Sequence, residues 1–147
     1  MGMLKLEGVT HWSIPVNDLD AAEKFYGEVL GLESKGRLGS SKMSCFAVGG
    51  HSILLCQRKD PIQRTPEQEN RLHHAFDVSP GTFVEACKLF ERIGVKIAEP
   101  IVYRARGHFT GRELYFLDPS GNMLELRDAT WKEGMPTPAF EDIVRSS

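Results

Sequence analysis

The sequence predicts an α+β fold built from two tandem βαβββ modules. Residues 11–32 can be laid over residues 73–95, and each segment begins with histidine and reaches valine five residues later. Each segment then enters a helical pattern that stops at glycine, followed by short β-prone runs. The chain has 147 residues, which suits one domain or two half-size modules sharing a core. We expect one domain with the following parts: a first module at 1–58, a linker at 59–69, a second module at 70–128 and a tail at 129–147.

The first module is expected to open with a strand that ends at Val16. Asn17 or Asp18 can accept the free amide hydrogens of a helix start, and apolar residues then recur at helical spacing until Gly31. Glycine-containing turns separate the runs that follow. The expected strands are residues 32–38, 43–48 and 52–57.

The second module repeats this order. Ser79 is a suitable helix cap and Pro80 suits the first helical position, after which an apolar stripe continues to Gly94. Residues 118–121, Asp-Pro-Ser-Gly, predict a turn between the last two strands. The expected strands are residues 95–97, 101–103, 114–117 and 123–127.

Composition and charge exclude several classes of function. Lys and Arg total 18 and Asp and Glu total 20, and no run of five like charges occurs, so nucleic-acid binding is not expected. There is no signal-peptide pattern and no stretch of 18 apolar residues, so neither export nor a membrane span is expected. The three cysteines have no C-x-x-C spacing, which indicates a reduced, cytoplasmic protein.

Strand alternation puts two histidines and a glutamate where a metal ion could bind. Side chains of a strand alternate between its faces, so His11 and His73 lie on equivalent faces, opposite the residues that pack under each helix. Glu125 places a carboxylate on the last strand, where a buried face would ordinarily carry an apolar residue. Taken singly, each of these residues is more often structural or solvated; the repeat and the shared parity favour a site for Zn, Mn, Fe(II) or Ni.

Three segments resemble the vicinal oxygen chelate superfamily, which includes glyoxalase I, extradiol dioxygenases, fosfomycin-resistance enzymes and bleomycin-binding proteins. They are H-W-S-I-P-V at 11–16, H-H-A-F-D-V at 73–78, and L-Y-F-L-D-P-S-G-N-M-L-E-L at 114–126. The last segment is the most specific, because it joins a D-P-x-G turn to Leu-Glu-Leu at a fixed distance. The resemblance runs from about residue 8 to residue 127.

The resemblance implies curled mixed sheets around a metal site, in a homodimer with exchanged modules. By position, His11, His73 and Glu125 match the family's metal ligands. Tyr115 matches a tyrosine that approaches the bound substrate in several members, and we expect it to donate a hydrogen bond to a substrate oxygen.

Departures from the family pattern narrow this expectation. Setting residues 53–56 under residues 123–126 puts Leu55 at the counterpart of Glu125, where glyoxalase I carries a fourth ligand. A three-ligand site of this kind is typical of the ring-cleaving dioxygenases and the fosfomycin-type enzymes. Arg71 stands where fosfomycin thiol transferases have tyrosine, and the loop at 104–113 lacks their serine pattern, which argues against antibiotic resistance.

Several polar side chains are candidates for substrate contact. His108 lies seven residues before Tyr115 and is a candidate acid or base. Ser13 shares the face of His11. The arginines of the loop at 104–113, together with one on the last expected strand, could bind an anionic substrate, although solvated loop charges are the commoner outcome. These candidates are Arg104, Arg106, Arg112 and Arg127.

The leading hypothesis is a divalent-metal enzyme that chelates a small substrate through two neighbouring oxygens. Ring cleavage would follow with Fe(II), and isomerase, lyase or transferase chemistry with a redox-inert ion. The alternative is a non-catalytic dimer that binds a drug or metabolite, as bleomycin-binding relatives do. A third hypothesis is a scaffold protein that uses its C-terminal tail as a contact.

Overall fold

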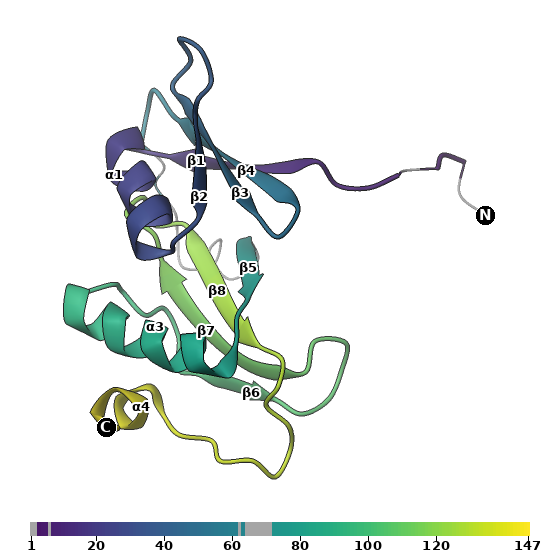
Figure 1. The fold of residues 1–147 in the computed structure, drawn as a ribbon, viewed down its shortest axis with the longest axis vertical. Helices are drawn as coiled ribbons and strands as arrows, with labels where there is room; N and C mark the ends of the chain where they lie inside the picture. Colours follow the sequence, from purple (N-terminus) through teal and green to yellow (C-terminus); the bar gives the residue numbers. More distant parts are fainter. Residues whose placement is uncertain (1–2, 6, 62, 64–71) are drawn as a thin grey trace. The chain divides into compact units, whose positions relative to one another are not determined.

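The computed structural model describes residues 3–5, 7–61, 63 and 72–147, and it divides into two compact units, Met1–Gln63 and Arg64–Ser147. Each unit holds one four-stranded sheet with a helix along one face (Figure 1). Most of the expected linker at 59–69, and also Arg71, lie outside the described residues. The expected α+β class and the pair of βαβββ modules are confirmed.

The first unit has the sheet order β1-β4-β3-β2, with β1 parallel to β4. Asp18 caps its helix, since the Asp18 carboxylate accepts a hydrogen bond from the Ala21 amide at 3.0 Å. Ile14, Val16 and Leu55 form a fully buried core between sheet and helix. The elements are β1 His11–Val16, α1 Leu19–Lys24, the π-helical turn η1 Phe25–Val29, β2 Glu33–Arg37, β3 Met43–Val48 and β4 His51–Gln57.

The second unit repeats this topology with the order β5-β8-β7-β6, and β5 is parallel to β8. Ser79 caps its helix and Gly94 ends it in the left-handed conformation, as the sequence predicted. Phe90 of the helix packs on Phe116 of the sheet with ring centroids 4.6 Å apart. The elements are β5 His73–Asp77, α3 Pro80–Ile93, β6 Val102–Arg104, β7 Gly111–Leu117, β8 Met123–Asp128 and α4 Phe140–Arg145.

A polar turn fixes the β7–β8 hairpin. One oxygen of Asp118 accepts hydrogen bonds from the backbone amides of Ser120 and Asn122, both at 2.8 Å, and the other accepts from the Asn122 side chain. Gly121 takes φ +83°, which glycine adopts without strain. The turn therefore determines which residues of β7 face which residues of β8.

Two expected strands differ in the structure. Residues 95–97 form no strand; Ile97 makes an isolated bridge to Phe116, with one backbone hydrogen bond to β7 on each side of it. β7 begins at Gly111, three residues before the expected start at 114, because its ladder with β8 extends to the pair Arg112–Asp128.

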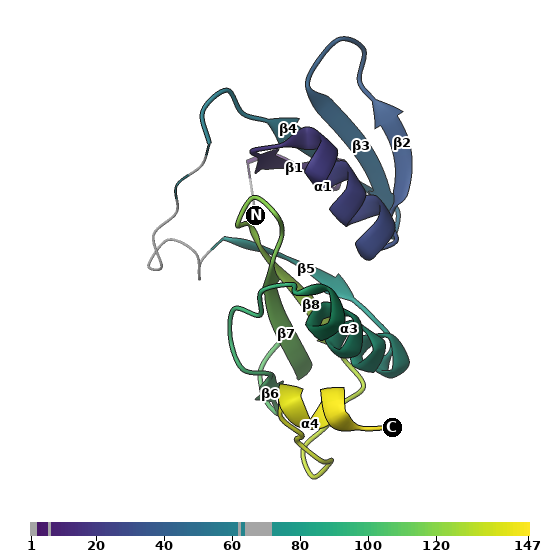
Figure 2. The same ribbon diagram turned by 90° about the vertical axis from the view of Figure 1, so that its left-hand side faces the viewer.

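The C-terminal tail packs on the second unit. The indole of Trp131 donates to the carbonyl of Pro136 at 3.0 Å, and the Trp131 ring lies 5.1 Å from that of Tyr103. Helix α4 contacts α3 and lies beside it in Figure 2. Phe140 and Ile143 of α4 are buried, so these residues add to the core of the unit. None of the helices in the described ranges is long and apolar enough to cross a membrane.

Candidate metal centre

Each sheet has one face against its helix and an opposite face, here called the open face. In the second unit the helix-side residues are apolar and buried, as at Leu114, Phe116 and Leu124. Strand register puts a set of polar residues on the open face instead. The members are His73, Asp77, Arg104, Glu113, Tyr115, Glu125 and Arg127.

The structure brings His73 and Glu125 together on this open face. Parallel pairing sets His73 opposite Met123 and Ala75 opposite Glu125, so both side chains project from the same side of adjacent strands. The Nε2 of His73 lies 3.1 Å from Oε2 of Glu125. The Glu125 side chain is only 6% exposed and that of His73 is 33% exposed. An imidazole nitrogen and a buried carboxylate oxygen, both of which can bind a metal ion, thus lie next to each other.

The environment of Glu125 favours the addition of a positive charge. Burial raises the pKa of Glu125, and the nearby carboxylate of Glu113 raises it further. His73, Tyr115 and Arg127 act in the opposite direction but do not compensate fully. A carboxylate that is costly to ionise in isolation gains from a bound cation, so the donor set at His73 and Glu125 fits a divalent metal ion.

Tyr115 and Glu113 extend this cluster. Tyr115 is the strand neighbour of Glu125, and its ring meets the His73 ring edge-on with centroids 5.5 Å apart. The Tyr115 hydroxyl donates to Oε2 of Glu113 at 3.0 Å. Arg104 donates to both oxygens of Glu113, at 3.0 and 3.1 Å. Burial and the two carboxylates raise the pKa of Tyr115, so its hydroxyl stays protonated at neutral pH.

Three of the four candidate arginines bind carboxylates of this chain. Besides the Arg104–Glu113 pair, Arg127 donates to Asp77 at 3.0 Å and to the carbonyl of Thr110. Arg112 points to the helix side, where it donates to Asp128 at 2.8 Å and lies over the Phe83 ring.

The remaining loop candidates, Arg106 and His108, are exposed. The ring of His108 meets that of Phe109 edge-on with centroids 4.9 Å apart. The described contacts therefore give His108 no partner on the open face of β7 and β8, and its role as an acid or base stays a prediction.

His11 and Ser13 belong to the first unit. Both lie on the open face of β1, as the sequence predicted, whereas Ile14 and Val16 are buried on the helix side. Trp12 has the parity of the buried residues but is 52% exposed. Thr10 Oγ1 lies 3.0 Å from Nδ1 of His11. In the tautomer whose Nδ1 donates to Thr10, Nε2 of His11 keeps the lone pair that a metal ion requires.

The sequence predicted Leu55 as the first-unit counterpart of Glu125, and this prediction is wrong by one residue. Ser13 pairs with Leu54 in the first unit, as Ala75 pairs with Glu125 in the second, so Leu54 occupies the equivalent position. Leu55 is fully buried on the helix side. The alignment of residues 53–56 under 123–126 missed this because it matched the apolar residues of the two strands and did not include their pairing with the first strand of each module. Leucine offers no metal donor in either alignment.

Sequence reasoning did not single out Glu113. The expected strand began at 114, so Glu113 was counted with the loop at 104–113. A strand begun at Gly111 would have given Glu113 the parity of Tyr115 and Glu125. Within the described ranges, no three His, Cys, Asp or Glu side chains gather as a metal site; His73 and Glu125 supply two donors in the second unit.

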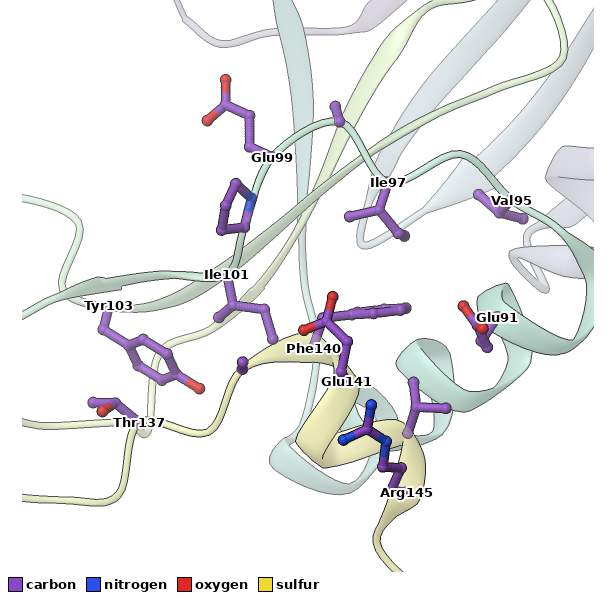
Figure 3. A pocket seen from close by; sticks show the side chains of 14 residues that line it. Glu91, Val95, Ile97, Glu99, Ile101, Tyr103, Thr137, Phe140, Glu141 and Arg145 are labelled. Carbon is purple, nitrogen blue, oxygen red and sulfur yellow. The ribbon is translucent and has the colours of Figure 1, made fainter.

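A separate cavity of about 820 Å³ lies on the helix side of the second unit. Figure 3 shows Tyr103, Phe140 and Arg145 around it, with acidic residues at its rim. Its lining includes none of the candidate metal or substrate residues. The cavity is therefore distinct from the open face that carries His73 and Glu125.

A sequence profile of the Glyoxalase/Bleomycin resistance protein/Dioxygenase superfamily matches residues 8–126. The chain is 27% identical over 128 residues to metallothiol transferase FosB of Staphylococcus saprophyticus, covering 87% of this chain and 81% of that protein. It is also 27% identical over 124 residues to glutathione transferase FosA of Serratia marcescens, covering 82% and 80%.

Among solved structures, the fosfomycin resistance protein FosX of Listeria monocytogenes, complexed with Mn(II) and sulfate, has a TM-score of 0.67 and 25% identity. The match covers 86% of this chain and 93% of that one. A mutant of the same FosX was solved with Mn(II) and 1S,2S-dihydroxypropylphosphonic acid, at a TM-score of 0.66 and 24% identity, covering 84% and 90%.

Proposed function

Because the chain belongs to the Glyoxalase/Bleomycin resistance protein/Dioxygenase superfamily, we propose that it is a divalent-metal enzyme of the transferase or lyase type. Its substrate would be a small molecule that offers two neighbouring oxygens. The observation that carries this proposal is a pair of possible metal-binding atoms, Nε2 of His73 and Oε2 of Glu125, which lie 3.1 Å apart. The carboxylate of Glu125 is buried. Relatives named as thiol transferases, and one solved with Mn(II), support the metal and the reaction type.

His73 and Glu125 would hold the ion, with His11 as the third protein ligand. The bound ion would act as a Lewis acid on the substrate oxygens, which is worth several kcal/mol in such sites. Leu54, at the counterpart of Glu125, adds no fourth ligand, so coordination positions stay available to the substrate.

The chain's own residues would bind and orient the substrate beside these donors. Tyr115 presents its hydroxyl on the same face as Glu125, within the set that includes Glu113. Burial of Glu125 and Glu113 keeps water from competing for their oxygens. The relatives named as thiol transferases favour a transferase reaction on the bound substrate.

Metal analysis of the purified protein tests this proposal. Protein prepared without chelator should carry close to one divalent ion per chain, and His73→Ala should remove it. His74→Ala is the matched control, because His74 has the opposite parity on the same strand. Protein free of metal that binds small ligands equally well with and without His73 would instead indicate a non-catalytic binding protein.

We also propose that the protein is a homodimer, as the family resemblance implies. Two modules of about 60 residues each have a small core, and association of two copies would bury further apolar surface. Light scattering should give twice the mass of the chain. A monomeric mass at micromolar concentration would contradict the dimer without affecting the test of the metal.

A further inference from the structure

The cavity on the helix side of the second unit has no part in the proposed reaction. Its volume of about 820 Å³ lies within the roughly 300–1,000 Å³ that small-molecule sites in proteins occupy. Three parts of the chain line it: the end of α3 with the segment that follows, β6, and the tail with α4 (Figure 3). All of them belong to the second unit, so this unit is sufficient to form the cavity.

Hydrogen bonds hold two walls of this cavity in place. The segment after α3 is tied to β7, where the backbone amide of Ala98 donates to the backbone carbonyl of Tyr115 at 2.9 Å. On β6, the Tyr103 hydroxyl donates to the carbonyl of Pro138 in the tail at 2.5 Å. Walls that are ordered before binding lower the entropy cost that a ligand must overcome.

The surface of the cavity is largely apolar. Aliphatic and aromatic side chains from all three parts line it, and all but Phe140 are only half-buried in the chain. A ligand with an apolar body would remove these side chains from water, and aromatic rings also attract cations. The apolar members are Val95, Ile97, Ile101, Tyr103, Phe140 and Val144.

The charges around the cavity are mostly negative. Glu91 comes from α3, Glu99 from the segment before β6 and Glu141 from the first turn of α4 (Figure 3). Arg145 is the single cationic side chain among the lining residues, so negative charge is in excess. The ion pairs formed by the described residues of the second unit involve other carboxylates, which are Asp77, Glu113, Glu125 and Asp128.

We propose that this cavity is a second ligand site, which takes a small organic cation with an apolar body, such as an alkyl or aralkyl amine. The apolar body lies against the cavity surface, and the ammonium group faces Glu91, Glu99 and Glu141. Because these carboxylates are partly in water, apolar burial supplies most of the affinity and the carboxylates supply the preference for positive charge. The site shares no residue with the pair His73 and Glu125, so it needs no bound metal.

Three probes with one apolar body and different charges test the site. At pH 7, 4-phenylbutylamine is a cation, 4-phenylbutanol is neutral and 4-phenylbutyrate is an anion. Isothermal titration calorimetry at low salt should show the amine binding about threefold more tightly than the alcohol, and the carboxylate binding most weakly. High salt should narrow these differences. His73→Ala should leave the affinity for the amine unchanged, which separates this site from the metal centre.

Four variants test the assignment of the charges and of the cavity. Glu99→Gln should lower the affinity for the amine about threefold and leave the alcohol unchanged, and Arg145→Gln should raise the affinity for the amine. Glu85→Gln is the matched control, because Glu85 is exposed on α3 and does not line the cavity. Val144→Trp fills the cavity and should abolish binding of all three probes.

Several results would overturn the inference. They are wild-type protein that does not bind the amine, equal affinities for the amine and the carboxylate, and a Glu85→Gln effect as large as that of Glu99→Gln. Loss of amine binding in folded His73→Ala protein would place the probe at the metal centre and would also overturn it. None of these results bears on metal binding by the wild type, so the proposed function is tested separately. Should Val144→Trp fail to fold, the comparison of Glu99→Gln with Glu85→Gln decides.

Discussion

The two units have one topology and very different open faces. Both sheets pair their first and last strands in parallel and start with a histidine, at His11 and His73. Beyond the histidine the equivalent positions diverge, and the first unit has uncharged residues where the second has ionisable or aromatic ones. The pairs, first unit before second, are Pro15 and Asp77, Met43 and Glu113, Cys45 and Tyr115, Leu54 and Glu125, and Cys56 and Arg127.

The helix-side positions of the two sheets are alike, whereas the open-face positions differ. The helix-side positions stay apolar in both units, because each sheet must bury one face against a helix to be stable. The open-face positions carry no such requirement, so one unit could acquire a cluster of acids and arginines while the other did not. In the second unit the polar side chains of the open face are concentrated along β7 and β8, whereas the contribution that we propose for the first unit is His11 alone.

The largest expected effect is a loss of metal affinity, and it is tested by placing glutamine at two equivalent positions, Glu125 and Leu54. Glu125→Gln should weaken metal binding more than about a hundredfold, because an amide oxygen carries no charge to bind the ion. Leu54→Gln, at the equivalent position, should leave the affinity within about twofold. Competition with a chromophoric chelator measures both. Equal losses would show that the first unit contributes to the site through Leu54 as strongly as the second does through Glu125.

Mixing two variants tests whether a metal site combines residues of two copies of the chain. His11→Ala and Glu125→Gln should each lack metal when purified alone. If sites combine His11 of one copy with Glu125 of another, exchanging subunits between the two proteins should restore about one quarter of the sites. Metal content after mixing measures this. No recovery, despite proven subunit exchange, would mean that each site is built from a single chain.

The sequence was sufficient to predict the repeat, the two helices that follow the first strand of each module, and the shared face of His73 and Glu125, but not α4 in the tail. Parity within a strand is a local property, so it needs only the correct strand and no knowledge of its neighbours. The pairing between strands depends on loop lengths, which is why Leu55 was chosen in place of Leu54. Glu113 was missed for a related reason: the ladder with β8 extends β7 to Gly111, and no local signal marks that start.

Substitution of Gly111 tests how closely the backbones of β7 and β8 must approach each other. It has φ +134°, and a Cβ there would lie 2.4 Å from the carbonyl oxygen of Asp128. Gly111→Ala should therefore destabilise the second unit by about 3 kcal/mol or more, through strain and a backbone clash. Gly49→Ala, at a β-turn of the first unit with open space around it, should cost only about 1 kcal/mol. Urea unfolding measures both.

A buried ion pair gives the next smaller effect. Asp128 is fully buried and binds Arg112 and Thr130; burial alone would raise the pKa of Asp128, but these hydrogen bonds outweigh it and lower the pKa. Asp128→Asn should cost about 2 kcal/mol at neutral pH. Because the folded pKa lies below the unfolded one, this contribution is present above about pH 4 and disappears as the pH falls through the folded value. The difference between wild type and variant should shrink accordingly.

The smallest effect is expected at the corresponding ion pairs of the first unit. Arg37 binds Glu23 and Asp20, but its side chain is 50% exposed and that of Asp20 is 87% exposed, so water and salt screen the attraction. Arg37→Gln should therefore change stability much less than Asp128→Asn, and the change should vanish at high salt. Each unit has one tryptophan, Trp12 or Trp131, so single-tryptophan variants can report unfolding of each unit separately. An Arg37→Gln effect as large as that of Asp128→Asn, and insensitive to salt, would contradict the inference that exposure to water and salt screens the ion pairs of Arg37.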